Sequence, residues 1–84
     1  MNGEKSTMTP MQCRMARAGL EWSARQLASR AGIGVNTVAR FEQGNEVLHG
    51  TVRKLRTVLE SEGVTFGQDG TTVTVRPSGG LASA

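Results

Sequence analysis

The chain has 84 residues and a formal net charge of +3, and 37% of its residues are hydrophobic. This length fits one small domain, and the separate periodic apolar segments argue against wholesale disorder. One cysteine excludes an internal disulfide, and no apolar run is long enough to cross a membrane. Residues 1–8 are polar, lack the apolar core of a signal peptide and predict a disordered arm, so we expect a cytoplasmic protein.

The first predicted helix covers residues 10–18. Thr9 is a good N-cap, and Pro10 fits the first helical position, where no backbone N–H is needed. The inward stripe of this helix contains Cys13, Ala16 and Leu20. The pattern therefore makes Cys13 a small core residue rather than a reactive nucleophile, since only one histidine is present to act as its base.

Two short helices, 23–31 and 35–43, follow with a tight turn between them. Ser23 predicts the start of the first, and Gln26 completes a capping box three residues later. Trp22, just before this cap, is interpreted as a packing residue rather than as a stacking platform for bases. Apolar and small residues recur at helical spacing through the pair. They are Leu27, Ala28, Ala31, Ile33, Val35, Val38 and Phe41.

The run from Trp22 to Gly44 resembles the helix-turn-helix of the Cro/repressor (XRE-type) DNA-binding family. The residues that carry the likeness are Leu27, Ala28, Gly32, Ile33, Val38 and the ending Phe41-Glu42-Gln43-Gly44. The likeness extends from Thr9 to about Phe66. It implies a mainly α fold with a four-helix repressor-like helix-turn-helix, and together with the C-terminal β-hairpin predicted below this domain covers residues 9–76.

The resemblance also implies which residues face the bases of double-stranded DNA. These are Val35, Asn36 and Arg40 on the second motif helix. Their chemistry agrees, because asparagine pairs with adenine, arginine with guanine, and an apolar side chain meets the thymine methyl group. The residues predicted to contact the DNA backbone are Ser23, Arg25, Thr37, Gln43, Asn45 and Thr51.

The resemblance implies a structural ion pair as well, between Arg17 in the first helix and Glu42 near the end of the recognition helix. Such a pair locks the first helix to the third. One position departs from the family pattern, since Gly34 stands where a serine or threonine usually caps the recognition helix.

A fourth helix is predicted over residues 51–62, with Thr51 as its N-cap. Residues 64–66 and 71–76 alternate with period two around a Gly-Gln-Asp-Gly turn, which indicates a β-hairpin. Its apolar face contains Val64, Phe66, Val73 and Val75. Because an isolated hairpin is marginal in water, this face must pack on the helices or on a second copy. These four residues are therefore the dimer-interface candidates, with the fourth helix as the second choice, and residues 77–84 are predicted to be a disordered tail.

The function these features favour is a sequence-specific transcriptional regulator, most simply a repressor that binds a palindromic operator as a homodimer. The alternative is a protein-interaction module or an antitoxin, in which the helices are a scaffold and the hairpin binds a partner protein. An enzyme is disfavoured, because we find no nucleophile–base constellation, no phosphate-binding loop and no metal cluster. We expect no cofactor, no metal and no membrane.

Overall fold

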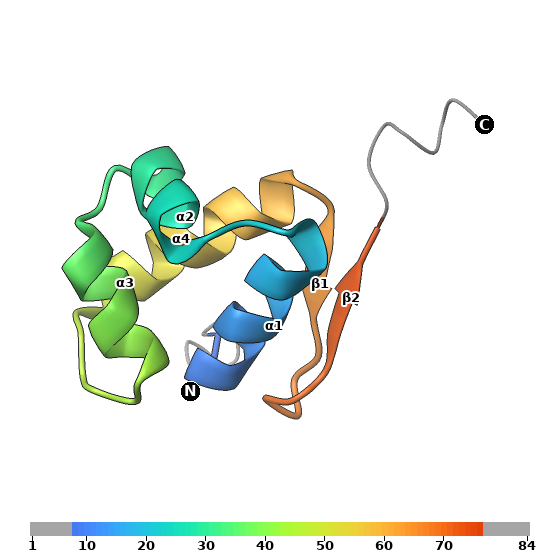
Figure 1. Ribbon diagram of the computed structural model, residues 1–84. Helices are drawn as coiled ribbons and strands as arrows, with labels where there is room; N and C mark the ends of the chain where they lie inside the picture. Colours follow the sequence, from blue (N-terminus) through green and yellow to red (C-terminus); the bar gives the residue numbers. More distant parts are fainter. Residues whose placement is uncertain (1–7, 77–84) are drawn as a thin grey trace.

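The computed structural model describes residues 8–76, so the predicted arm over residues 1–7 and the tail over 77–84 lie outside the described part. Figure 1 shows four helices followed by a two-stranded antiparallel hairpin, which confirms the predicted mainly α fold. The elements are α1 (Pro10–Leu20), α2 (Ala24–Ala31), α3 (Val35–Glu42), α4 (His49–Ser61), β1 (Val64–Phe66) and β2 (Val73–Val75). No helix within the described residues is long and apolar enough to span a membrane.

The first two helices begin with complete capping boxes. The Thr9 hydroxyl accepts a hydrogen bond from the backbone amide of Gln12, and the Gln12 side chain accepts one from the backbone amide of Thr9. Ser23 and Gln26 form the same reciprocal pair at the start of α2. Each box satisfies two amides that a helix start leaves without an intrahelical partner, so the sequence determines both starts locally.

Helix α1 continues to Leu20, two residues beyond the predicted end. Gly19 lies inside the helix at a place where β2 packs closely: a Cβ at this position would lie 2.6 Å from Cγ2 of Val75. Glu21 ends the helix in the left-handed region, at φ 61°. The glycine is therefore a site of close packing and not a helix stop.

Helix α4 begins two residues earlier than predicted, and Thr51 is not its N-cap. The N-cap is Leu48, whose carbonyl accepts the amides of Thr51 and Val52 and whose side chain makes no capping bond. The amide of Thr51 is thus already inside the first helical turn. The other starts and ends agree with the predicted ranges or differ from them by one residue, except that the second strand begins two residues later than predicted.

The core lies between the helices and the hairpin. Its most buried side chains are Met8, Cys13, Ala16, Leu27, Val38, Leu55, Leu59 and Val64, and Ala28, Phe41 and Val52 complete it. The inclusion of Met8 in the disordered arm was wrong, because this side chain is 1% exposed and belongs to the core. Helices α2 and α3 have only eight residues each, too few to be stable alone, so this shared core stabilises them.

The hairpin covers α1 and α4 within the same chain. Val64 pairs with Val75 and Phe66 with Val73, which places the four predicted side chains on one face. Of the two alternatives for that face, packing on the helices is the one observed. Val64 is 1% exposed, so it is wrong as a dimer-interface candidate: its own chain already covers it.

The hairpin turn is fastened to the start of α1. The Thr9 hydroxyl donates to the carbonyl of Gly70 at 2.7 Å. The side-chain amide of Gln12 donates to the carbonyls of Gly67 and Thr72, at 2.9 and 3.0 Å. The second strand is shorter than predicted because the amide of Thr72 bonds the Asp69 carboxylate, as part of the turn.

Candidate nucleic-acid interface

The turn between α2 and α3 is tight. Gly32 adopts the left-handed region at φ 69°, and its amide donates to the carbonyl of Ala28. The amide of Ile33 donates to the same carbonyl at 2.9 Å. This turn contains three residues, and it brings α3 against α2.

Helix α3 has one buried face and one exposed face. Val38, Phe41 and Glu42 are buried, whereas Asn36, Arg40 and Gln43 are exposed. The exposed three follow the spacing i, i+4, i+7 and therefore lie along one stripe of the helix. We call Asn36, Arg40 and Gln43 the reading stripe.

Two further predicted contact residues, Val35 and Thr37, flank the reading stripe. Both are half-buried, and Val35 packs against the core. Only part of each side chain is therefore open to a ligand. The structure brings the predicted base-contacting residues together on the first turns of one helix.

The start of α3 has no side-chain cap. Its N-cap is Gly34, which makes no capping hydrogen bond. Within residues 8–76, no protein group accepts the amides of Val35 and Asn36. These two donors, at the positive end of the helix dipole, are available to an anion or to a polar ligand edge.

The predicted backbone-contacting residues come from three other places. Ser23 and Arg25 are exposed at the start of α2, and the Ser23 oxygen already accepts one amide, which leaves its hydroxyl proton to donate. Asn45 is exposed after α3, and its amide bonds the carbonyl of Arg40 at 2.9 Å. Thr51 is half-buried in the first turn of α4.

The ion pair expected between Arg17 and Glu42 is present and bidentate. Arg17 donates through Nε and Nη2 to the two carboxylate oxygens, at 2.8 and 2.7 Å. Its third nitrogen donates to the carbonyl of Trp22 at 3.1 Å. The hydrogen bonds to Glu42 raise the pKa of the Arg17 guanidinium. One side chain thus joins α1, the start of the motif and the end of α3.

Two more groups from α1 hold the same glutamate. The Cys13 thiol donates to its carboxylate at 3.1 Å, and Arg14 donates to its backbone carbonyl. Burial and the neighbouring Glu42 raise the pKa of Cys13 well above its usual value, so the thiol stays neutral. This agrees with the structural role expected for Cys13, since reactive cysteines have lowered pKa values.

Trp22 is half-buried against the core, at the entrance to α2. The guanidinium of Arg30 lies over its ring, 4.5 Å from the ring centroid. The ring is therefore covered by its own chain on that face, which supports the packing interpretation over base stacking.

Positive charge is distributed unevenly between paired and unpaired side chains. Within the described part of the chain, Arg17, Arg30 and Arg56 have carboxylate partners. The exposed cations without such a partner there are Arg14, Arg25, Arg40, Arg53, Lys54 and Arg76. Unpaired surface cations are the groups that neutralise phosphates.

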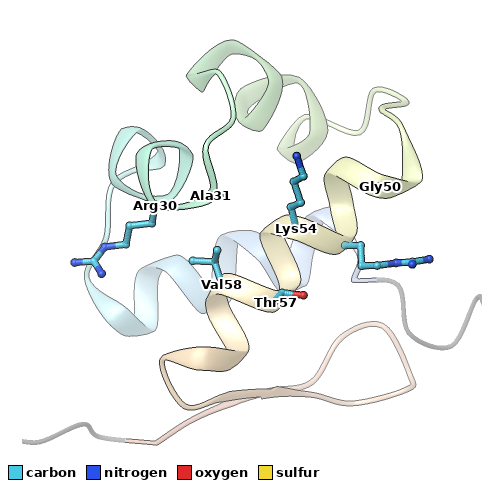
Figure 2. Close-up of a pocket in the computed structure, with 7 residues that line it drawn as sticks. Arg30, Ala31, Gly50, Lys54, Thr57 and Val58 are labelled. Carbon is cyan, nitrogen blue, oxygen red and sulfur yellow. The ribbon is translucent and has the colours of Figure 1, made fainter.

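A hollow of about 430 Å³ separates the end of α2 from α4. Figure 2 shows Arg30 and Ala31 on one side of it and Lys54 and Val58 on the other. None of the predicted DNA-contacting residues lines this hollow. It is thus a separate feature from the reading stripe.

Sequence reasoning missed Gln12 and Arg14. The capping box was recognisable from Thr9 and Gln12, spaced by three, but the second role of Gln12 in holding the hairpin depends on carbonyls 55 and 60 residues away. Arg14 carried no local signal. No group of three metal-ligating side chains gathers anywhere in residues 8–76.

Searches for related proteins do not classify the chain. No family model matches it, and no curated protein matches it. The functional argument therefore depends on the geometry of the molecule and on the chemistry of its surface.

Proposed function

We propose that this protein is a sequence-specific regulator of transcription that binds double-stranded DNA through α3. The observation that carries the proposal is the reading stripe, an exposed polar surface on a helix whose opposite face is fixed by the core and by the Arg17–Glu42 pair. A rigid support holds reading side chains within the narrow tolerance that base recognition requires.

The major groove is about 12 Å wide and admits one α-helix. With α3 in the groove, Asn36 pairs with an adenine and Arg40 with a guanine, and the exposed part of Val35 meets a thymine methyl group. Each bidentate pair discriminates against the wrong base by about 1–3 kcal/mol. The free amides at the start of α3 add donors toward the DNA.

Most contacts with phosphate come from outside the reading stripe. The Ser23 hydroxyl and the start of α2 donate to one phosphate, and Arg25, Asn45 and Thr51 donate to others. Gln43, at the end of the stripe, and Thr37, at its side, lie next to the backbone. These contacts fix the orientation of α3 and carry no base information.

One such module reads only a few base pairs. Useful specificity follows when two copies bind a palindrome whose half-sites lie about 34–36 Å apart. We therefore propose a homodimer that represses transcription by occupying its operator.

The test is the substitution Arg40→Ala, measured on an operator and on all its single-base variants. We expect binding to weaken by about 1–3 kcal/mol and the base preference to relax at one position. Arg53→Ala is the matched control, because it removes an exposed, unpaired arginine from α4 and should leave every base preference intact. An equal loss for Arg40→Ala on all sequences would contradict base reading by this residue.

A further inference from the structure

The hairpin has an open outer edge on β2. In the antiparallel pair, the Gly67 amide donates to the Thr72 carbonyl at 2.8 Å, and the Arg76 amide donates to the Gly63 carbonyl at 3.1 Å. Residues 72 and 76 therefore direct their backbone groups toward β1, and the alternation of an antiparallel ladder directs those of Val73 and Val75 away from it. Since the sheet has two strands, these four polar groups have no strand beside them in residues 8–76.

The surface beside this edge is apolar. Val73 and Val75 are half-buried, whereas Val64 on β1 is fully buried, so the side chains of β2 keep exposed area. On α1, Met11 is 44% exposed and Met15 is 39% exposed. Met15 lies between Gln12 and Gly19 at helical spacing, and these two residues contact the hairpin. Met15 therefore lies beside the hairpin on α1, and Met11 lies one helical turn before it.

We propose that a second copy of this chain pairs with β2 along its open edge and makes a four-stranded antiparallel sheet. In the register that uses all four free groups of each strand, Val73 lies opposite the partner's Val75. The same register places Thr74 opposite the partner's Thr74, on the two-fold axis. The arrangement is self-complementary and closed, as a symmetric dimer requires.

Charge complementarity selects a second copy as the occupant. This register places Arg76 opposite the partner's Thr72. Within one chain, the Thr72 hydroxyl donates to the Asp69 carboxylate at 2.6 Å, so the carboxylate lies on the same outward face. Arg76 is exposed, and neither it nor Asp69 has an ion-pair partner in the described part of the chain. The dimer therefore contains two symmetric pairs between Arg76 and the partner's Asp69.

The purpose of this interface rests on the proposed function. The dimer supplies the second α3 helix, which reads the second half-site of a palindromic operator. Figure 1 shows α3 and β2 at opposite ends of the molecule, so a copy bound at β2 leaves the reading stripe uncovered. Its test needs no DNA. A monomeric protein that still reads bases would overturn the interface alone, and a dimer that reads none would overturn the regulator alone.

The first test compares Val73→Pro with Val73→Ala by sedimentation equilibrium of the full chain. Both substitutions shorten the same side chain, but only proline removes the outward N–H, a change that edge strands tolerate within their own sheet. We expect a concentration-dependent dimer for the unchanged protein and for Val73→Ala, and a monomer for Val73→Pro. Equal association of the two variants, or a monomeric unchanged protein up to about 1 mM, would overturn the proposal.

A second variant keeps the proposal testable if proline disturbs the hairpin. Arg76→Glu places like charges opposite each other at both ends of the interface, so we expect the dimer to weaken about tenfold or more. Arg53→Glu makes the same charge change on α4 and should leave the association constant unaltered. If Arg76→Glu and Arg53→Glu weakened the dimer equally, the effect would come from net charge alone, and this result would overturn the register.

Discussion

Helices α1 and α2 differ from α3 and α4 in how they begin. The first two start with reciprocal capping boxes, at Thr9 and Ser23. The other two start at Gly34 and Leu48, neither of which makes a side-chain cap bond. Helices α1 and α2 thus satisfy some of their own first amides, whereas α3 and α4 leave theirs to solvent or to a ligand.

This difference teaches that α3 is positioned by tertiary contacts. Its buried face places Val38 and Phe41 in the core. Its last residue, Glu42, accepts hydrogen bonds from α1: the carboxylate accepts from Arg17 and Cys13, and the backbone carbonyl accepts from Arg14. The contacts on its buried face and at its last residue hold α3 in place, so its N-terminus can remain uncapped and exposed. A helix that inserts into a DNA groove needs such an arrangement.

The largest effect is expected from a substitution that removes the Arg17–Glu42 pair, which holds α3 against α1. Arg17→Ala leaves the Glu42 carboxylate nearly buried and without its charge partner, since that side chain is 8% exposed. We expect the free energy of unfolding to fall by about 3–5 kcal/mol, measured by urea denaturation. The matched control is Glu60→Ala, which removes the i, i+4 pair with Arg56 from its more exposed side, at 43% exposure, and should cost about 0.5 kcal/mol or less. Similar losses for the two variants would contradict the role of the buried pair.

A smaller effect sharpens the comparison at the helix starts. Ser23→Ala removes the cap of α2 and should cost about 1 kcal/mol in thermal or urea unfolding. Gly34→Ser gives α3 the cap it lacks, at a φ of −68° that serine adopts freely and with no atom closer than 4.0 Å to its new Cβ. We expect a gain of a few tenths of a kcal/mol. A loss of stability on Gly34→Ser would show that the start of α3 is not simply an uncapped helix end.

The smallest effect lies in the hairpin turn. Hydrogen bonds from Thr72 and Thr71 lower the pKa of the exposed Asp69 from 3.8 to about 2. A carboxyl group with a lowered folded-state pKa contributes stability that is present above pH 3.8 and lost as the pH falls through about 2. We therefore expect the amide protons of the turn to lose protection from exchange in that window. Asp69→Asn should lack this pH dependence, and an unchanged pH profile in the variant would contradict the assignment.

Much of the fold follows from local sequence. Ser23 and Gln26, spaced by three, determine the start of α2, and apolar residues at helical spacing determine which face of α3 is buried. The reading stripe follows from the same periodicity, because Asn36 and Arg40 lie opposite Val38 and Phe41. These features depend on residues a few positions apart, which a sequence displays directly.

The remaining features depend on contacts between distant segments. Met8 ends a polar stretch and is nevertheless buried as part of the core. Gln12 is 1% exposed because two hairpin carbonyls satisfy its amide, and Gly19 stays helical because Val75 packs against it. No local sequence pattern indicates such distant partners. The burial of Met8, the end of α1 and the burial of Val64 on β1 were therefore not predictable from the sequence.

Selection of bound duplexes from a random DNA library, repeated at two salt concentrations, tests the central claim that α3 reads bases. The account predicts a short palindrome, with affinity that falls steeply as salt rises because phosphate contacts release counterions. It also predicts that Asn36→Ala and Arg40→Ala each relax a different position of the half-site. Recovery of no motif, with only weak salt-sensitive binding, would contradict the account.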